Sequence, residues 1–120
     1  MNKRYLYRAK TFETGDLVFG SLVYSPKEDE YYIVEHNGEE LSWSVDENTI
    51  SQCTGFEDDN GYLIFEGDEV VYENYSSRSK HTIVWRQGSF KLQNERGECL
   101  YRLSECLPYV LKLIDPTYIE

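Results

Sequence analysis

The residues most able to do chemistry lie in the stretch TGFEDDNGYLIFEGDEVVYE, residues 54–73, which contains seven carboxylates and no Lys or Arg. Converging carboxylates are the ligands that calcium prefers. A metal site could be drawn from Asp58, Asp59, Glu66, Asp68 and Glu69. The spacing of a calcium loop is absent, because with Asp59 as position one, Ile64 stands in place of the glycine and Val70 in place of the final glutamate. We therefore expect no metal site and no cofactor.

The same acids have a simpler interpretation as turn residues. The tetrapeptide Asp58-Asp59-Asn60-Gly61 separates two apolar segments, and Asp, Asn and Gly favour turns through Asx hydrogen bonds and positive φ. The tripeptide Glu66-Gly67-Asp68 precedes the apolar run EVVYE. We expect a left-handed backbone at Gly67 and a hydrogen bond from backbone N–H to the Asp68 carboxylate. Each acid of the stretch would then have either a structural role in a turn or a solvent-facing position.

Nucleophilic catalysis has little support in the sequence. The chain has three cysteines, Cys53, Cys99 and Cys106, without CxxC spacing, and two histidines, His36 and His81. A Cys53–His36 pair is conceivable, but no local pattern marks it. The odd cysteine count favours reduced, mostly buried thiols and a cytoplasmic location. We predict that the protein is not an enzyme and has no catalytic residues.

The charge of the chain is distributed very unevenly. Of 22 Asp and Glu, 15 lie between Glu28 and Ser77, where Lys and Arg are absent. The rest of the 120-residue chain carries all 12 Lys and Arg against 7 acids, a net charge of +5. This acidic middle is either a solvated surface or a recognition surface for a basic partner. It disfavours direct binding of nucleic acid, because neutralising phosphates requires clustered cations.

The elements that must position these residues are short strands. Alternating apolar and polar residues predict strands within the ranges 3–10, 16–25, 31–36, 41–45, 68–73, 81–86, 89–93 and 109–114. Asn37-Gly38 is a strong hairpin signal, from which we predict that residues 32–35 pair with residues 39–42. Gly20 suggests a bulge. The segment 73–80 is expected to be a mobile loop, and residues 98–107 are compatible with either a strand or a short helix.

These patterns predict a single all-β domain over residues 1–120. The strands would be mainly antiparallel and form a small SH3-like barrel or a compact sandwich with added hairpins, with at most one short helix. Trp43, Trp85, Tyr31 and Tyr72 fall in the predicted strands, and most of these four side chains are expected in the core. The sequence has no apolar run of about 20 residues, so we expect no membrane partner.

The segment TISQCTGFEDDNG (residues 49–61), followed by IFEGD (residues 64–68), resembles the YopX family signature QYTGLxDxNGxxIYEGD. Flanking segments, including the residue ranges 8–9, 20–23, 83–85 and 88–90, are also similar to that family. Cys53 and Phe56 depart from the usual aromatic residue and leucine. The resemblance implies a β-rich fold, an accessory role in phages and prophages, and no established activity. The residues of the signature to which we assign a structural role are Thr54, Gly55, Gly61, Ile64, Glu66, Gly67 and Asp68.

The leading functional hypothesis is an acidic protein-binding module that inhibits or modulates a basic, nucleic-acid-binding host protein. The residues expected to bind the partner are Glu39, Glu40, Asp46, Glu47, Glu57, Asp58 and Asp59. A homo-oligomer that joins the acidic middle to the basic ends of a second copy is also compatible with the charge pattern. Two alternatives are a nucleic-acid-binding factor that uses a basic groove and a metal-dependent enzyme. The groove would comprise Lys3, Arg4, Arg8, Lys10, Arg78 and Lys80.

Overall fold

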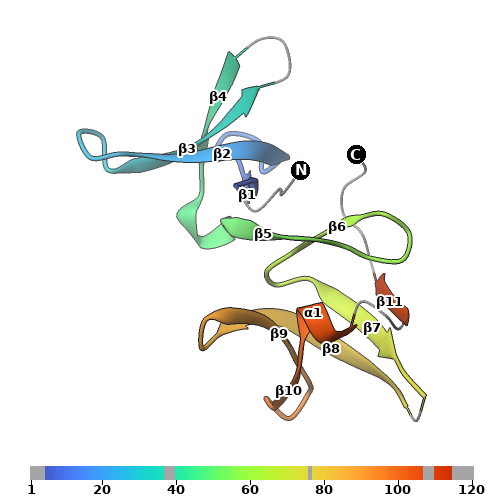
Figure 1. Cartoon of the computed structure of the whole chain (residues 1–120). Coiled ribbons are helices and arrows are strands. Elements are labelled where there is room, and N and C mark those ends of the chain that lie inside the picture. The colour runs from blue at the N-terminus through green and yellow to red at the C-terminus, as the bar shows by residue number, and fades with distance from the viewer. Residues whose placement is uncertain (1–4, 37–39, 76, 107–109, 115–120) are drawn as a thin grey trace. The chain divides into compact units, whose positions relative to one another are not determined.

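The computed structural model describes residues 5–36, 40–75, 77–106 and 110–114, and of His36 and Glu40 it describes the backbone alone. Its strands form two antiparallel sheets, and the described residues contain one four-residue α-helix and one 3-10 turn (Figure 1). The predicted all-β fold is therefore confirmed. The strands are β1(Tyr7–Lys10), β2(Leu17–Ser25), β3(Glu30–His36), β4(Glu40–Val45), β5(Ser51–Glu57), β6(Leu63–Phe65), β7(Glu69–Glu73), β8(Arg78–Arg86), β9(Ser89–Gln93), β10(Cys99–Arg102) and β11(Val110–Leu113); the helical turns are η1(Glu47–Thr49) and α1(Leu103–Cys106).

The contacts within the chain divide it into two compact units, Met1–Cys53 and Thr54–Glu120. Strand β5 begins in the first unit and continues into the second, where it is the neighbour of β6. The prediction of a single domain over residues 1–120 stays a prediction. Within the described residues, no helix has the length and apolar character needed to cross a membrane.

The first unit is a sheet with the strand order β4-β3-β2-β1-β5. The end of β1 also approaches β4, since Thr11 bridges Val45 and the Asp46 N–H donates to the Lys10 carbonyl at 2.9 Å. The sheet therefore curls upon itself, as expected for a small barrel. Its concave face buries Ala9, Val18, Ile33 and Val45.

Gly20 allows β2 and β3 to approach each other closely, and it does not form the predicted bulge. The pairing of β1 with β2 runs without interruption from Tyr7–Gly20 to Lys10–Leu17. A β-carbon built on Gly20 would lie 2.1 Å from the carbonyl oxygen of Val34, so any larger side chain would collide with β3. β2 changes partners here, because it pairs with β3 from Ser21 onward.

The predicted hairpin between β3 and β4 is present, but its register differs from the prediction. Residues 32–35 pair with residues 41–44, from Tyr32–Ser44 to Glu35–Leu41, and not with residues 39–42. The last pair, His36–Glu40, leaves three residues in the connection. A two-residue turn at Asn37-Gly38 does not fit this register, although residues 37–39 themselves lie outside the described part of the chain.

The second unit contains a five-stranded sheet with the strand order β10-β9-β8-β7-β11. Alternate residues of its central strands point inward, so β7 buries Val70 and Tyr72 and exposes Glu69 and Glu73. The helix α1 follows β10 directly, so the ambiguous segment contains both a strand over Cys99–Arg102 and a helical turn over Leu103–Cys106. The buried residues of this core are Ile64, Val70, Tyr72, Ile83, Phe90, Leu92, Leu103, Cys106 and Leu111.

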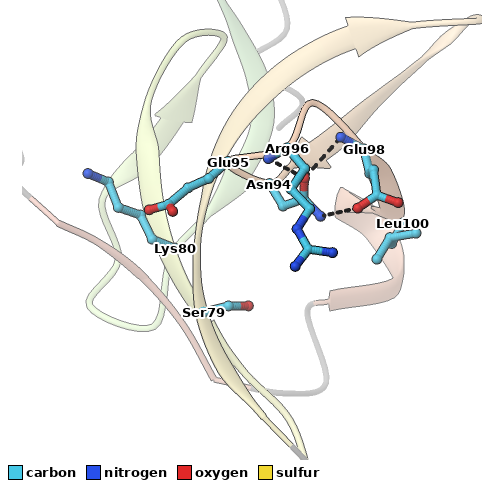
Figure 2. Close-up of a pocket in the computed structure, with 7 residues that line it drawn as sticks. All are labelled: Ser79, Lys80, Asn94, Glu95, Arg96, Glu98 and Leu100. Carbon is cyan, nitrogen blue, oxygen red and sulfur yellow. Dashed lines mark hydrogen bonds between the residues drawn. The ribbon is translucent and has the colours of Figure 1, made fainter.

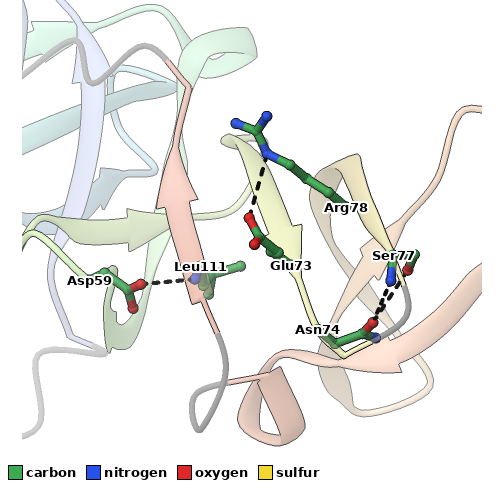
Figure 3. A network of polar contacts seen from close by, with 6 residues as sticks. All are labelled: Asp59, Glu73, Asn74, Ser77, Arg78 and Leu111. Carbon is green, nitrogen blue, oxygen red and sulfur yellow. Dashed lines mark hydrogen bonds and ion pairs between the residues drawn. The ribbon is translucent and has the colours of Figure 1, made fainter.

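The expected loop over residues 73–80 is shorter than predicted, because β7 extends to Glu73 and β8 begins at Arg78, and its mobility stays a prediction. The Asn74 N–H donates to the Ser77 carbonyl at 2.9 Å, and the Asn74 side-chain oxygen accepts from the Ser77 N–H at 3.1 Å (Figure 3). β8 therefore starts at Arg78, which pairs with Glu73. An asparagine that hydrogen-bonds its own turn stabilises a tight connection that polarity alone does not reveal.

Gly67 has the predicted positive φ, at +90°. It occupies the third position of a turn in which the Asp68 N–H donates to the Phe65 carbonyl at 3.1 Å. The Asp68 carboxylate in turn accepts from the Phe65 N–H at 2.8 Å. A turn with positive φ at its third residue favours glycine or asparagine there.

We expect Gly67→Val to lower the free energy of unfolding by about 1–3 kcal/mol through backbone strain. A β-carbon at Gly67 would meet no atom within 4 Å, so strain and not collision is the cause. Gly67→Asn is the matched control and should lose clearly less stability, since asparagine tolerates positive φ. The measurement is equilibrium urea unfolding, and equal stability of the wild type and the valine variant would contradict this account.

Candidate protein-binding surface

The signature begins with a buried threonine that fixes the backbone of β5. The Thr54 hydroxyl donates to the Ile64 carbonyl at 2.8 Å and accepts from the Phe56 N–H at 3.1 Å. Gly55 follows with a φ of +86°. Thr54 therefore ties the start of the acidic stretch to β6, and its side chain, 1% exposed, is unavailable to a partner.

Asp58 is a buried structural residue. Its carboxylate accepts three backbone N–H groups, from Asn60 and Tyr62 at 2.9 Å each and from Leu113 at 3.0 Å. Only 6% of the residue is exposed. The prediction that Asp58 contacts a partner is therefore wrong, because its carboxylate is already used to hold the turn and β11 together. The turn interpretation of this tetrapeptide is confirmed, with Gly61 at a φ of +85°.

Asp59 also binds β11 but remains exposed. Its N–H donates to the Leu111 carbonyl at 2.9 Å, and its carboxylate accepts from the Leu111 N–H at 3.3 Å (Figure 3). β11 thus lies between two partners, because on its other side it pairs with β7, from Val110–Glu73 to Leu113–Val70. One carboxylate oxygen of Asp59 can still meet an external cation.

The remaining candidates for partner binding divide between the two units. Glu47, in the first unit, and Glu57, in the second, are exposed. Asp46 caps η1, since its carboxylate accepts from the Asn48 N–H at 3.0 Å. Glu39 and the side chain of Glu40 lie outside the described part of the structure. The acidic middle therefore contains both structural acids and solvent-facing acids.

The cations of the proposed nucleic-acid groove are partly neutralised. Lys80 lies 2.9 Å from a carboxylate oxygen of Glu69, which raises the pKa of the Lys80 amine. Arg78 lies 3.7 Å from Glu73 (Figure 3). Both pairs cross the β7–β8 hairpin, and both are solvent-exposed. Arg8 and Lys10 belong to the other unit, and Lys3 and Arg4 lie outside the described residues.

Two of the three cysteines are enclosed by the protein. Cys53, Cys99 and Cys106 form no disulfide with one another, and Cys53 and Cys106 are buried, as predicted. Burial raises the pKa of the Cys106 thiol to about 11, which keeps it protonated and weakly nucleophilic. The Cys53–His36 pair considered from the sequence falls outside the described part of the chain, since it involves the His36 side chain.

A buried histidine is the polar residue that the sequence analysis missed. His81 is 4% exposed, and its Nε2 atom lies 2.7 Å from the Ser79 hydroxyl. Its ring packs edge-on against Tyr72 and Tyr101. Burial lowers the pKa of His81, which favours the neutral imidazole. Alternation along β8 was the available signal, since it places His81 on the same face as Ile83.

An open hollow of about 510 Å³ lies beside the β9–β10 turn and is lined by Ser79, Lys80, Asn94, Glu95, Arg96, Glu98 and Leu100 (Figure 2). Its charges cancel. The Asn94 side chain accepts from the Arg96 and Glu98 N–H groups at 2.9 Å each, which shapes the turn. In the described residues no three His, Cys, Asp or Glu side chains are grouped to hold a metal ion.

Two large aromatic side chains are more exposed than the sequence suggests. Trp43 is 38% exposed on β4 and Trp85 is 42% exposed on β8, where it packs edge-on against Phe90. Of the four aromatic residues expected mostly in the core, Tyr72 is buried and Tyr31 is partly buried against the core of the first unit. The prediction that most of the four belong to the core is therefore wrong.

Residues 6–109 match the family described as YopX protein, and this range includes the whole signature and most of each unit. The chain belongs to the YopX family. Among solved structures, protein EF1440 from Enterococcus faecalis is similar, with 22% sequence identity, a TM-score of 0.54 and coverage of 90% of this chain and 89% of that one. This similarity concerns the fold. A comparison with curated proteins gives no match.

The YopX signature of this chain is largely explained by backbone geometry. Thr54, Asp58 and Asp68 accept backbone N–H groups, and Gly55, Gly61 and Gly67 have positive φ. Asp58, Gly61, Gly67 and Asp68 shape turns, whereas Thr54 and Gly55 shape the backbone of β5. The surface acids that remain for binding, Glu47, Glu57 and Asp59, lie beside these turns.

We expect Asp58→Ala to lower the free energy of unfolding by about 3 kcal/mol, because each buried N–H left without an acceptor costs roughly 1–3 kcal/mol. Asp58→Asn should have an intermediate effect, since its amide oxygen can still accept while its amide nitrogen cannot serve a second donor. Glu57→Ala, at the exposed neighbouring position, should change stability by about 0.5 kcal/mol or less. Urea unfolding of the three variants measures this; equal losses at positions 57 and 58 would refute the structural role of Asp58.

Calcium, magnesium or manganese should leave the melting temperature nearly unchanged. The Asp58 and Asp68 carboxylates already accept backbone N–H groups, so they cannot converge on one ion without breaking the turns. A metal that bound the native state at 100 times its dissociation constant would add about 2.7 kcal/mol. Differential scanning calorimetry with each ion and with EDTA tests this expectation, and a large rise that Asp59→Asn abolishes would restore the metal hypothesis.

Proposed function

We propose that this YopX protein is a non-enzymatic accessory protein of a phage or prophage that acts in the bacterial cytoplasm. It binds a basic host protein through its acidic middle and inhibits or modulates that protein. The natural ligand of the target is a polyanion, which the carboxylates imitate. The observation that carries the proposal is the absence of Lys and Arg between Glu28 and Ser77, a segment with 15 acids.

Electrostatics supports this proposal in two ways. Carboxylates without neighbouring cations produce a negative potential that accelerates association with a basic surface. The same potential selects against acidic proteins and nucleic acids. Glu47 and Glu57 are exposed, and within the described residues neither forms an ion pair. Their charge is therefore available to a partner.

The absence of an enzymatic role is part of the proposal and is supported by how the reactive residues are used. Asp58 and Asp68 hold turns, and His81 is buried beside Ser79 and two tyrosines. The Cys106 thiol is protonated. A catalytic group has to reach a substrate, and these groups are committed to the core or the backbone.

The nucleic-acid hypothesis is weaker for a specific reason. Lys80 and Arg78, two of its six cations, lie next to Glu69 and Glu73. A phosphate would have to compete with these carboxylates. Association of the acidic middle with the basic ends of a second copy remains a possible homo-oligomer, which size-exclusion chromatography at low and high salt detects.

The proposed function predicts salt-dependent capture of a basic protein. The immobilised chain is incubated with host lysate at low and at high salt, and the captured protein is purified for association kinetics. Replacing Glu47, Glu57 and Asp59 by Gln, Gln and Asn should lower its association rate about tenfold at low salt and less at high salt. The matched control replaces Glu13, Glu95 and Glu105 by Gln, which changes the net charge equally outside the acidic middle.

Equal effects of the two triple variants on the association rate would contradict the proposal, because the rate would then depend on the net charge of the chain and not on the acidic middle. So would binding of labelled duplex DNA or RNA at 150 mM salt in preference to the basic protein. Metal-dependent turnover of a substrate would replace the proposal with the enzyme hypothesis.

A further inference from the structure

Strand β4 combines three features that point to one kind of ligand: a free backbone edge, an apolar face and an acidic face. It is the terminal strand in the order β4-β3-β2-β1 (Figure 1). The last part of its outer edge is occupied by the end of β1 and the residues that follow it. On the side away from β3, the Ser44 carbonyl accepts from the Phe12 N–H at 3.2 Å and the Asp46 N–H donates to the Lys10 carbonyl at 2.9 Å.

Alternate residues of a strand direct their backbone groups to the same edge. The N–H and carbonyl of Ser42 therefore point in the same direction as those of Ser44. Phe12 covers the edge at Ser44, and the structure gives Ser42 no partner on this edge among the described residues. A short part of β4, residues 40–43, consequently offers unpaired backbone groups to an incoming strand.

The apolar face of β4 is formed by Leu41 and Trp43. They pair with Glu35 and Ile33 of β3, so they project from the face that contains the core of the first unit. Unlike the buried Ile33, Leu41 is 41% exposed and Trp43 is 38% exposed. The apolar face thus continues beyond the core toward the free edge, where a strand added to β4 would cover it.

The opposite face is acidic. Ser44 pairs with Tyr32, and the Ser44 hydroxyl donates to the Glu30 carboxylate at 3.4 Å. The Tyr32 hydroxyl donates to the same carboxylate at 2.9 Å and also contacts Glu28. The hydrogen bonds from the Tyr32 hydroxyl to Glu28 and Glu30 raise the pKa of Tyr32, and the bond to Glu28 has the larger effect. No Lys or Arg of the described residues forms an ion pair with either acid.

We propose that the free edge of β4 binds an extended segment of a basic protein in which apolar residues alternate with Lys or Arg. Side chains of an added strand alternate between the two faces. Its apolar residues would cover Trp43 and Leu41, while its cations would approach Glu28 and Glu30. Addition of a strand supplies main-chain hydrogen bonds, and the alternating faces supply specificity.

This inference rests on the proposed function, since it identifies the surface through which a basic partner binds. The site inferred here is the edge of β4, whereas the triple variant of the proposed function changes Glu47, Glu57 and Asp59. The two ideas can therefore fail separately. If the acid-dependent partner binds a Ser42→Pro variant as tightly as the wild type, the proposed function stands and the β4 site is overturned.

The probe is an acetylated and amidated hexapeptide, Val-Lys-Val-Lys-Val-Lys, titrated against the full chain carrying Trp85→Phe. Trp43 is then the single tryptophan. We expect its emission to shift on binding. The combined variant Glu28→Gln, Glu30→Gln should bind about tenfold more weakly at low salt and differ less at high salt, whereas Glu13→Gln, Glu95→Gln should match the wild type. A Val-Glu hexapeptide should not bind.

Two measurements separate strand addition from loose electrostatic attraction. Ser42→Pro removes the outward N–H without removing a hydrogen bond to β3, and proline is tolerated at such edge positions. It should weaken binding at least tenfold. If this variant fails to fold, a hexapeptide N-methylated on alternate amides tests the same point with the unaltered protein. Binding of both N-methylated registers as tightly as the parent peptide, or no binding of the parent at low salt, would overturn the inference.

Discussion

The carboxylate of Asp58 is the interaction on which much of the second unit depends. It binds the N–H groups of Asn60 and Tyr62 within its own turn and that of Leu113, which lies 55 positions later in the sequence. A buried carboxylate is stable only when such donors surround it. The turn can therefore form fully only when β11 is in place, and β11 is held to the turn by the same group. Local geometry and long-range packing are thus linked through one side chain.

This constraint divides the acids of the chain by role. Asp46, Asp58 and Asp68 have short side chains that can reach nearby backbone N–H groups, and each stabilises a turn. The exposed Glu47 and Glu57 have longer side chains and face solvent next to those turns. Aspartate is favoured in turns because its side chain imitates a backbone acceptor. The exposed acids of this YopX protein therefore lie next to the aspartates that shape its backbone turns.

The same separation clarifies what membership of the YopX family implies. The signature describes how β5, β6 and β7 are connected, and the similarity to EF1440 extends this conclusion to the fold. Neither concerns a binding partner. Features that could distinguish this chain functionally lie mostly outside the signature, such as the exposed Trp43 and the carboxylates of Glu28 and Glu30.

Much of the fold was determined by the sequence alone. Period-two alternation identified most of the strands, although not β5 and β6, and the residue types of the signature identified its turns, because both depend on local backbone preferences. The charge layout, too, is a property of the sequence. The tertiary structure decided what local preferences cannot encode. The β3–β4 register depends on which residues reach the core, and Gly20 is required by the approach of the Val34 carbonyl. The burial of Asp58 and His81 and the exposure of Trp43 follow from strands distant in sequence. A side chain's surroundings are fixed only when such strands pack, and this is why an acid that resembles a binding residue in the sequence serves as the acceptor for β11.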